Sequence, residues 1–179
     1  DRTQPTLPMT FDATEQRTAD YVRHGTTNLF ASLTVGTGEV FGLCSPTRNG
    51  ADFLGFLKKA VKPHADKDVH VVLDNLSTHN TPDVQDWLKH NPNVTFHFTP
   101  TGSSWLNQVE IWFGNITRQS IRRGTFSSVK VLINQIRDYI DHWNANAKPF
   151  VWTATADEIL AKVRVVQTSI KKLVDNNAK

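Results

Sequence analysis

The sequence predicts an α/β fold, a mixed sheet with helices on its faces. Three observations support this prediction. Val69–Leu73 is a short apolar run without alternation, as is typical of a buried parallel strand. Two runs rich in Val, Thr, Leu and Phe flank Gly36–Gly38, as the strands of a hairpin would. The C-terminal half repeats its apolar residues at helical spacing, and 179 residues suffice for one domain with a sizeable core.

The first half of the chain supplies the hairpin and a helix. Residues 1–19 contain two prolines and no periodicity, which indicates an extended arm. The hairpin strands are expected within Tyr21–Val35 and Glu39–Leu43. Asn49 can then cap a helix that ends at Pro63, because proline interrupts helical hydrogen bonding.

Two strands and a short helix follow. Val69–Leu73 is expected to be buried on both faces, as parallel strands are. Thr81 and Pro82 form a cap and first-turn pair for a short helix, and Val94–Phe98 reads as the next strand. The order of elements is therefore hairpin, helix, strand, helix, strand.

The remaining elements are predicted to be helices. Val109–Ile116 has apolar residues at helical spacing, and a second such helix follows Ser127 or Ser128 as its cap. Thr155 and Glu158 form a capping box that opens a last helix. This helix has an apolar stripe that comprises Ile159, Val163, Val166, Ile170 and Leu173. The stripe is expected to pack either on its own domain or on a neighbouring subunit.

Composition restricts the class of protein. The net charge is +3 and the isoelectric point is about 9.1, which is compatible with a polyanionic partner. Cys44 is the single cysteine, so an intramolecular disulfide and a cysteine-based zinc site are excluded. No apolar run approaches the roughly 20 residues that span a bilayer. We therefore expect a cytoplasmic protein without membrane contact.

Two carboxylates are candidates for chemistry. Asp74 follows Val69–Leu73 directly, and ligands collect at the carboxyl ends of parallel strands. Glu110 lies at the start of an apolar helix, where we expect it to face inward and to require a cation. Both residues have structural alternatives, because Asp74 with Asn75 can form a turn and Glu110 can favour the helix dipole. Together they supply the carboxylate oxygens that Mg²⁺ prefers.

The segments VLDNLSTH and SSWLNQVEIWF, with 35 residues between Asp74 and Glu110, carry a resemblance to a known family. The chain resembles the catalytic domain of bacterial insertion-sequence transposases related to the mariner group, from DRTQP to FVWTATADEILAKV. The resemblance implies a ribonuclease H-like fold with an Asp-Asp-Glu triad and two Mg²⁺ or Mn²⁺ ions. It makes Asp74 the second acid and Glu110 the third. Residues 1–150 would form the catalytic domain, and residues 151–179 a C-terminal helix for dimer contact.

Three further residues match the family around its acids. Asn75, His79 and Asn107 would position the metal ligands or the substrate. His79 can instead be a capping or packing histidine. In the family the first acid ends a strand just upstream of a segment like DRTQP, so that acid and its strand are expected to be missing from this chain. A hairpin paired directly with Val69–Leu73 would refute the missing strand.

The resemblance also implies partners. Double-stranded DNA with terminal inverted repeats, target DNA and a second subunit in a homodimer are expected, in a nucleoid-associated bacterial protein. DNA contact is expected from a basic group and one aromatic residue, namely Arg118, Arg122, Arg123, Lys130 and Trp105. The basic residues can instead form a solvated helix face, and Trp105 can belong to the core. The family's helix-turn-helix module that reads the repeats is expected to be missing from these 179 residues.

Three functions fit these observations. The first is a DNA transposase that cleaves and joins strands with metal ions. The second is a catalytically inactive DNA-binding or assembly module from a decayed or domesticated transposase, which the absent first acid favours. The third is a nuclease of the same fold, such as a junction resolvase, which would cut without joining.

Overall fold

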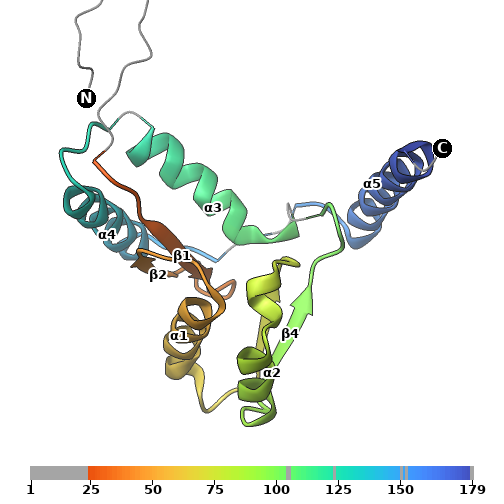
Figure 1. The fold of residues 1–179 in the computed structure, drawn as a ribbon, viewed down its shortest axis with the longest axis horizontal. Coiled ribbons are helices and arrows are strands. Elements are labelled where there is room, and N and C mark those ends of the chain that lie inside the picture. The colour runs from red at the N-terminus through yellow and green to blue at the C-terminus, as the bar shows by residue number, and fades with distance from the viewer. Residues whose placement is uncertain (1–23, 104–105, 123, 150, 152, 178–179) are drawn as a thin grey trace, which may run out of the picture.

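The structure is a computed structural model and describes residues 24–103, 106–122, 124–149, 151 and 153–177. It has the α/β character that the sequence predicts (Figure 1). The elements, in order, are β1 (Asn28–Leu33), β2 (Val40–Ser45), α1 (Gly50–Val61), β3 (Val69–Leu73), α2 (Pro82–Lys89), β4 (Val94–Phe98), α3 (Gln108–Ile116), α4 (Val129–Ala145) and α5 (Ala156–Asn177).

The strands form two small sheets instead of one. β1 and β2 pair antiparallel with Asn28 opposite Ser45, whereas β3 and β4 pair parallel with Val69 opposite Val94. β3 and β4 have the predicted bounds, and β1 lies within its expected range, whose first residue, Tyr21, is outside the described residues. β2 extends to Ser45, two residues beyond the expected Leu43. β1 and β3 are not hydrogen-bonded neighbours, so the pairing that would refute a missing strand is not found among the described residues. The missing strand stays a prediction.

The hairpin of β1 and β2 separates two apolar clusters. Phe30 and Leu43 contact the first cluster, in which α1 packs against β3, β4 and α2. Leu29 and Leu33 contact the second cluster, which is centred on Trp112 of α3 and on α4. Alternating strand residues point to opposite faces, so one hairpin serves both clusters. Figure 1 shows α1 on one side of the hairpin and α3 on the other.

Three of the predicted helix caps are confirmed. Asn49 accepts from the amide of Asp52 at 2.9 Å and Asp52 accepts from the amide of Asn49 at 3.2 Å, which completes a capping box. Ser128 caps α4 through the amide of Val131 at 3.3 Å. The box of Thr155 and Glu158 opens α5, with hydrogen bonds of 2.8 and 3.3 Å. These caps fix where the helices begin.

Thr81 departs from its predicted role. It precedes α2 with an extended backbone, but its side chain makes no cap hydrogen bond. The side chain lies instead against the start of α1, where a Cβ built on Gly50 would come within 2.6 Å of the Thr81 methyl group. The hydroxyl is buried without a hydrogen-bond partner in the described structure. Packing between the starts of α1 and α2 has displaced the cap.

The prediction that β3 is buried on both faces is wrong. His70 and Val72 point away from α1 and are exposed, Val72 to 52%. The neighbouring Phe98 of β4 is 40% exposed. The first apolar cluster covers only the opposite face of β3 and β4. A run of apolar letters cannot show whether the fold supplies a second layer.

The last helix, α5, contacts the body of the protein through the predicted stripe. Val163 is buried, and a Cβ built on Gly102 would come within 2.6 Å of Ile170 and 3.2 Å of Val166. The opposite side of α5 is open, since Leu160 and Val165 are 51% and 66% exposed. Val166 and Ile170 of the stripe therefore lie close to Gly102, and the expected dimer contact of this helix stays a prediction. None of the described helices combines the length and apolar character needed to cross a bilayer.

One side chain joins α4 to the hairpin. The Asn144 amide accepts from the Val40 N–H at 2.8 Å and donates to the Val40 carbonyl at 2.9 Å. Val40 is buried, so water cannot replace either bond when the amide is removed. The Asn144 side chain thus pairs with the backbone of Val40 in β2 as a neighbouring strand would.

We expect Asn144→Ala to lower the free energy of unfolding by about 2–4 kcal/mol, because two backbone groups of Val40 would be left buried without partners. Asn134→Ala on the exposed side of α4 is the matched control and should change stability by less than about 0.5 kcal/mol. Urea unfolding followed by circular dichroism measures both. Equal stability of the two variants would contradict the role of Asn144.

Candidate active site

Asp74 is the first residue after β3, at the carboxyl end of a parallel strand. Its side chain is partly buried, with 28% exposed. A 3₁₀ turn at Ser77–Asn80 brings His79 back, so that its Nδ1 lies 3.1 Å from Asp74 Oδ1 and 3.1 Å from the Asp74 carbonyl oxygen. A single ring nitrogen therefore contacts both the side chain and the backbone of Asp74.

His79 is itself held in place. Its side chain is only 14% exposed, and its ring lies against Phe53 of α1, with ring centroids 4.4 Å apart. The core of the first cluster thus orients the histidine, and the histidine orients the carboxylate. His79 therefore packs on Phe53 and contacts Asp74, and its role toward a metal ion or substrate stays a prediction.

Asn75 joins the two strands of the parallel sheet. Its side-chain amide donates to the carbonyl of Thr99, the residue that follows β4. The Thr99 amide in turn donates to the Leu73 carbonyl at 2.9 Å. These bonds fix the carboxyl ends of β3 and β4 relative to each other. Asn75 therefore shapes the strand end from which Asp74 projects.

Glu110 lies in the first turn of α3, which begins nine residues after β4 ends. Asn107 is the cap, and its side chain accepts from the amide of Val109 at 3.4 Å. The expectation that Glu110 faces inward is wrong, because its side chain is exposed while Trp112 is fully buried. Residues two apart in a helix point in different directions, so burial of Trp112 leaves Glu110 outside.

The site is incomplete within the described residues. The oxygen donors of Asp74 and Glu110 suit Mg²⁺ chemically. However, no group of three His, Cys, Asp or Glu side chains that could hold a metal ion occurs in the described ranges. The binding of metal ions by Asp74 and Glu110 therefore stays a prediction.

The expected DNA contacts lie on one continuous stretch. Arg118 belongs to a π-helical segment, Thr117–Ile121, that extends α3, and Arg122 follows it. Both are exposed, as is Lys130 in the first turn of α4. Arg118 also donates to Asn115 Oδ1 at 2.6 Å. Arg123 and Trp105 lie outside the described residues, so their expected DNA contacts stay predictions.

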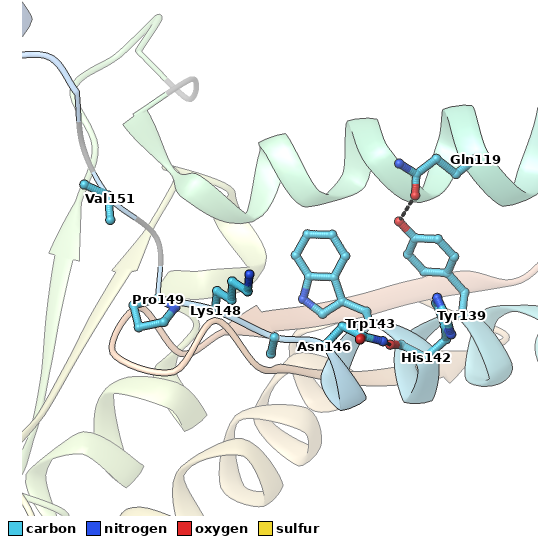
Figure 2. A pocket seen from close by; sticks show the side chains of 9 residues that line it. Gln119, Tyr139, His142, Trp143, Asn146, Lys148, Pro149 and Val151 are labelled. Atoms are coloured by element: carbon cyan, nitrogen blue, oxygen red, sulfur yellow. Dashed lines mark hydrogen bonds between the residues drawn. The ribbon is translucent and has the colours of Figure 1, made fainter.

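Sequence reasoning missed a pocket beyond this stretch, at the C-terminal end of α4. Figure 2 shows Tyr139 and Trp143 of α4 beside Gln119 of the π-helical segment, with Lys148 on the segment that follows α4. The signal available was an aromatic pair spaced i,i+4 together with nearby cations.

His79 provides a prediction with a conservative rescue. For the metal-dependent DNA cleavage that the resemblance implies, we expect His79→Ala to lower the rate by about 10- to 100-fold, because loss of a residue that orients a ligand costs this much. His79→Asn should retain most activity, since the Asn amide nitrogen can take the place of Nδ1. Cleavage of labelled duplex DNA measures both. Equal loss in the two variants would indicate that packing on Phe53 is the dominant role.

The chain is similar to several known proteins. A family model described as a DDE superfamily endonuclease matches residues 1–133. The insertion element IS630 uncharacterized 39 kDa protein of Shigella sonnei is 30% identical over 115 residues. A cryo-EM structure of a simian T-cell lymphotropic virus intasome in complex with PP2A regulatory subunit B56 gamma is similar with a TM-score of 0.46 and 12% identity.

The extent of these matches is partial. The matched region makes up 63% of this chain and 33% of the Shigella protein. The match to the intasome structure covers 74% of this chain and 45% of that chain. The chain thus spans about a third of the length of the insertion-element protein. The family model covers both Asp74 and Glu110.

Proposed function

Because the chain belongs to the DDE superfamily of endonucleases, we propose that it is the catalytic part of an insertion-sequence DNA transposase. It would cleave DNA strands at transposon ends and join them to target DNA. The observation that carries this proposal is the Asp74 carboxylate, held at the end of β3 by His79 and followed after 35 residues by Glu110. The similarity to an insertion-element protein supports the same reading.

The proposal gives each residue of the site a role. Asp74 and Glu110 would hold two Mg²⁺ or Mn²⁺ ions, with a third acid from outside the described residues. Such ions lower the pKa of water and stabilise the charge that develops on the leaving oxygen. His79 orients Asp74, while Asn75 and Asn107 fix the strand end and the helix start from which the two acids project. Arg118, Arg122, Arg123 and Lys130 would contact phosphates, and Trp105 would stack on an unpaired base.

The remaining parts of the proposal concern the whole assembly. We infer a ribonuclease H-like sheet in which one further strand, carrying the third acid, lies between β1 and β3. The separate pairing of β1 with β2 and of β3 with β4 leaves room in the hydrogen-bonding pattern for such a strand. Transposon ends, target DNA and a homodimer would be the partners, and the relation to the mariner group belongs to the same proposal.

The test is cleavage and joining of transposon-end duplexes in the presence of Mg²⁺ or Mn²⁺. The 179-residue chain would be compared with a version extended upstream. Activity in the extended version alone would support an upstream acid and strand. Absence of both cleavage and joining in either version, with DNA binding retained, would contradict a transposase and favour the binding or assembly module.

The absence of a three-residue metal group in the described ranges is the observation that favours this inactive module. A resolvase-type nuclease is distinguished by its products, because it would hydrolyse DNA without transferring strands. The same gel assay, with a labelled target duplex added, therefore separates the three functions.

A further inference from the structure

The pocket at the C-terminal end of α4 has a volume of about 510 Å³, which is in the range of ligand sites. It lies between α4, the π-helical segment and residues 146–151, and contains neither Asp74 nor Glu110. Its polar and aromatic lining consists of Gln119, Tyr139, His142, Trp143, Asn146 and Lys148 (Figure 2). Among the residues that the structure describes, no acidic side chain lines this pocket.

Two aromatic rings form a fixed wall of this pocket. The Trp143 indole N–H donates to the Gly38 carbonyl at 2.9 Å, and the Tyr139 hydroxyl donates to Gln119 Oε1 at 2.8 Å. The two rings stack on each other, with centroids 6.4 Å apart and planes inclined by 28°. Because both rings are anchored by hydrogen bonds, a ligand would not have to order them. Anchored aromatic faces are suited to stack on a planar ring.

Positive charge lies beside these rings. Lys148 lines the pocket and is exposed. Arg118 is close enough for its charge to lower the pKa of Tyr139, although burial raises that pKa more and the net shift is upward. An aromatic wall combined with cations favours a ligand that has both a planar ring and a negative charge.

Amide groups are available to recognise the edge of such a ring. Gln119 uses its Oε1 for Tyr139, and Asn146 uses its Nδ2 for the His142 carbonyl at 3.1 Å. Within the described structure this leaves the Gln119 amide as a donor and the Asn146 oxygen as an acceptor. A donor and an acceptor together match the hydrogen-bonding edge of a nucleobase.

The backbone of Gln119 adds an independent observation. Gln119 belongs to the π-helical segment, in which the Arg122 N–H donates to the Thr117 carbonyl at 2.8 Å. Such i→i+5 segments are rare and occur frequently at functional sites, because they move side chains out of the regular helical positions. Here the irregular segment presents Gln119 to the pocket and Arg118 to its rim.

We propose that this pocket binds an unpaired nucleotide of a DNA strand, with the base against Tyr139 and Trp143 and the phosphate near Lys148. The assignment of the nucleotide to a DNA strand rests on the proposed function. The preference for a planar ring with a negative charge rests on the residues of the pocket alone. Gln119 and Asn146 face the edge of the base, and Arg118 contributes to the attraction for the strand.

The experiment measures fluorescence anisotropy of a labelled single-stranded ten-nucleotide thymidine DNA with the 179-residue chain. Tyr139→Leu should weaken binding by about 5- to 100-fold, whereas Tyr139→Phe, which keeps the ring, should bind nearly as wild type. Lys148→Ala should reduce the salt dependence of the binding constant by the amount expected for about one phosphate contact. Lys59→Ala, at the exposed end of α1, is the matched control and should leave binding unchanged.

Failure of this proposal is separable from failure of the transposase proposal. Wild-type binding by both Tyr139→Leu and Lys148→Ala would overturn the pocket as a nucleotide site, even if duplex cleavage proceeds. Absence of single-strand binding by the wild-type chain would overturn it as well. Capture of deoxyadenosine monophosphate without any strand binding would overturn the assignment to DNA.

Discussion

Asp74→Ala is expected to abolish DNA cleavage while leaving DNA affinity nearly unchanged. The experiment requires a version of the protein that cleaves transposon-end DNA. Stabilisation by a bound metal ion is worth several kcal/mol, so loss of its ligand should lower the rate by about 1,000-fold or more. Affinity depends mainly on phosphate contacts with cations, which Asp74 does not make. Single-turnover cleavage and a binding titration of the same duplex measure the two quantities.

Two matched variants make this result specific. Asp74→Asn keeps the size of the side chain and its hydrogen bond to His79 through the amide oxygen, yet it should be nearly as inactive, because it removes the negative charge. Asp66→Asn changes an exposed acid in the loop before β3 and should leave cleavage unchanged. Metal-dependent cleavage retained by both Asp74 variants would refute the assignment of Asp74 as a ligand.

Trp112→Ala is expected to have the largest effect on stability. Trp112 is fully buried and lies at the centre of the second cluster, where its ring is 5.5 to 6.5 Å from those of Phe113, Tyr139 and Trp143. Replacing a buried tryptophan with alanine typically costs about 3–5 kcal/mol. For a domain of this size the melting temperature should fall by roughly 10 °C. Urea and thermal unfolding measure the change.

Trp112→Phe separates the contribution of the aromatic ring to stability from that of the indole nitrogen. Trp112 Nε1 is buried without a hydrogen-bond partner in the described structure, so its removal should cost nothing in hydrogen bonding. We expect Trp112→Phe to be clearly more stable than Trp112→Ala. A phenylalanine variant as unstable as the alanine variant would indicate that the indole nitrogen has a partner, for example a buried water. Because α3 also carries Glu110, Trp112→Ala should in addition lower cleavage.

The fold was predictable wherever local rules decide it. β3 and β4 lie where strand-forming runs predict them, and the caps at Asn49, Ser128 and Thr155 follow from local hydrogen bonding. Thr81 differs because contact with Gly50, which is distant in sequence, decides the orientation of its side chain. Local chemistry predicts a cap only where no such packing competes with it.

The position of Asp74 after β3 was predictable from the sequence, whereas the surroundings of Glu110 were not. Asp74 at a strand end and its contact with His79 agree with the sequence reading. The exposure of Glu110 does not, because apolar neighbours on both sides in sequence were taken for neighbours in space. The pocket was missed since Gln119, Tyr139 and Lys148 come from separate elements. Only the chain's path through the second cluster brings them together.

The divided sheet also has a consequence for the behaviour of concentrated samples. β1 and β3 each have one hydrogen-bonded neighbour, so each keeps an edge of unpaired N–H and C=O groups in the described structure. Such edges are templates for strand addition between molecules, and exposed Val72 and Phe98 add an apolar surface beside one of them. Light scattering should therefore rise with protein concentration. A modest net charge of +3 gives little electrostatic repulsion between molecules to oppose this self-association. Added salt would screen that repulsion further.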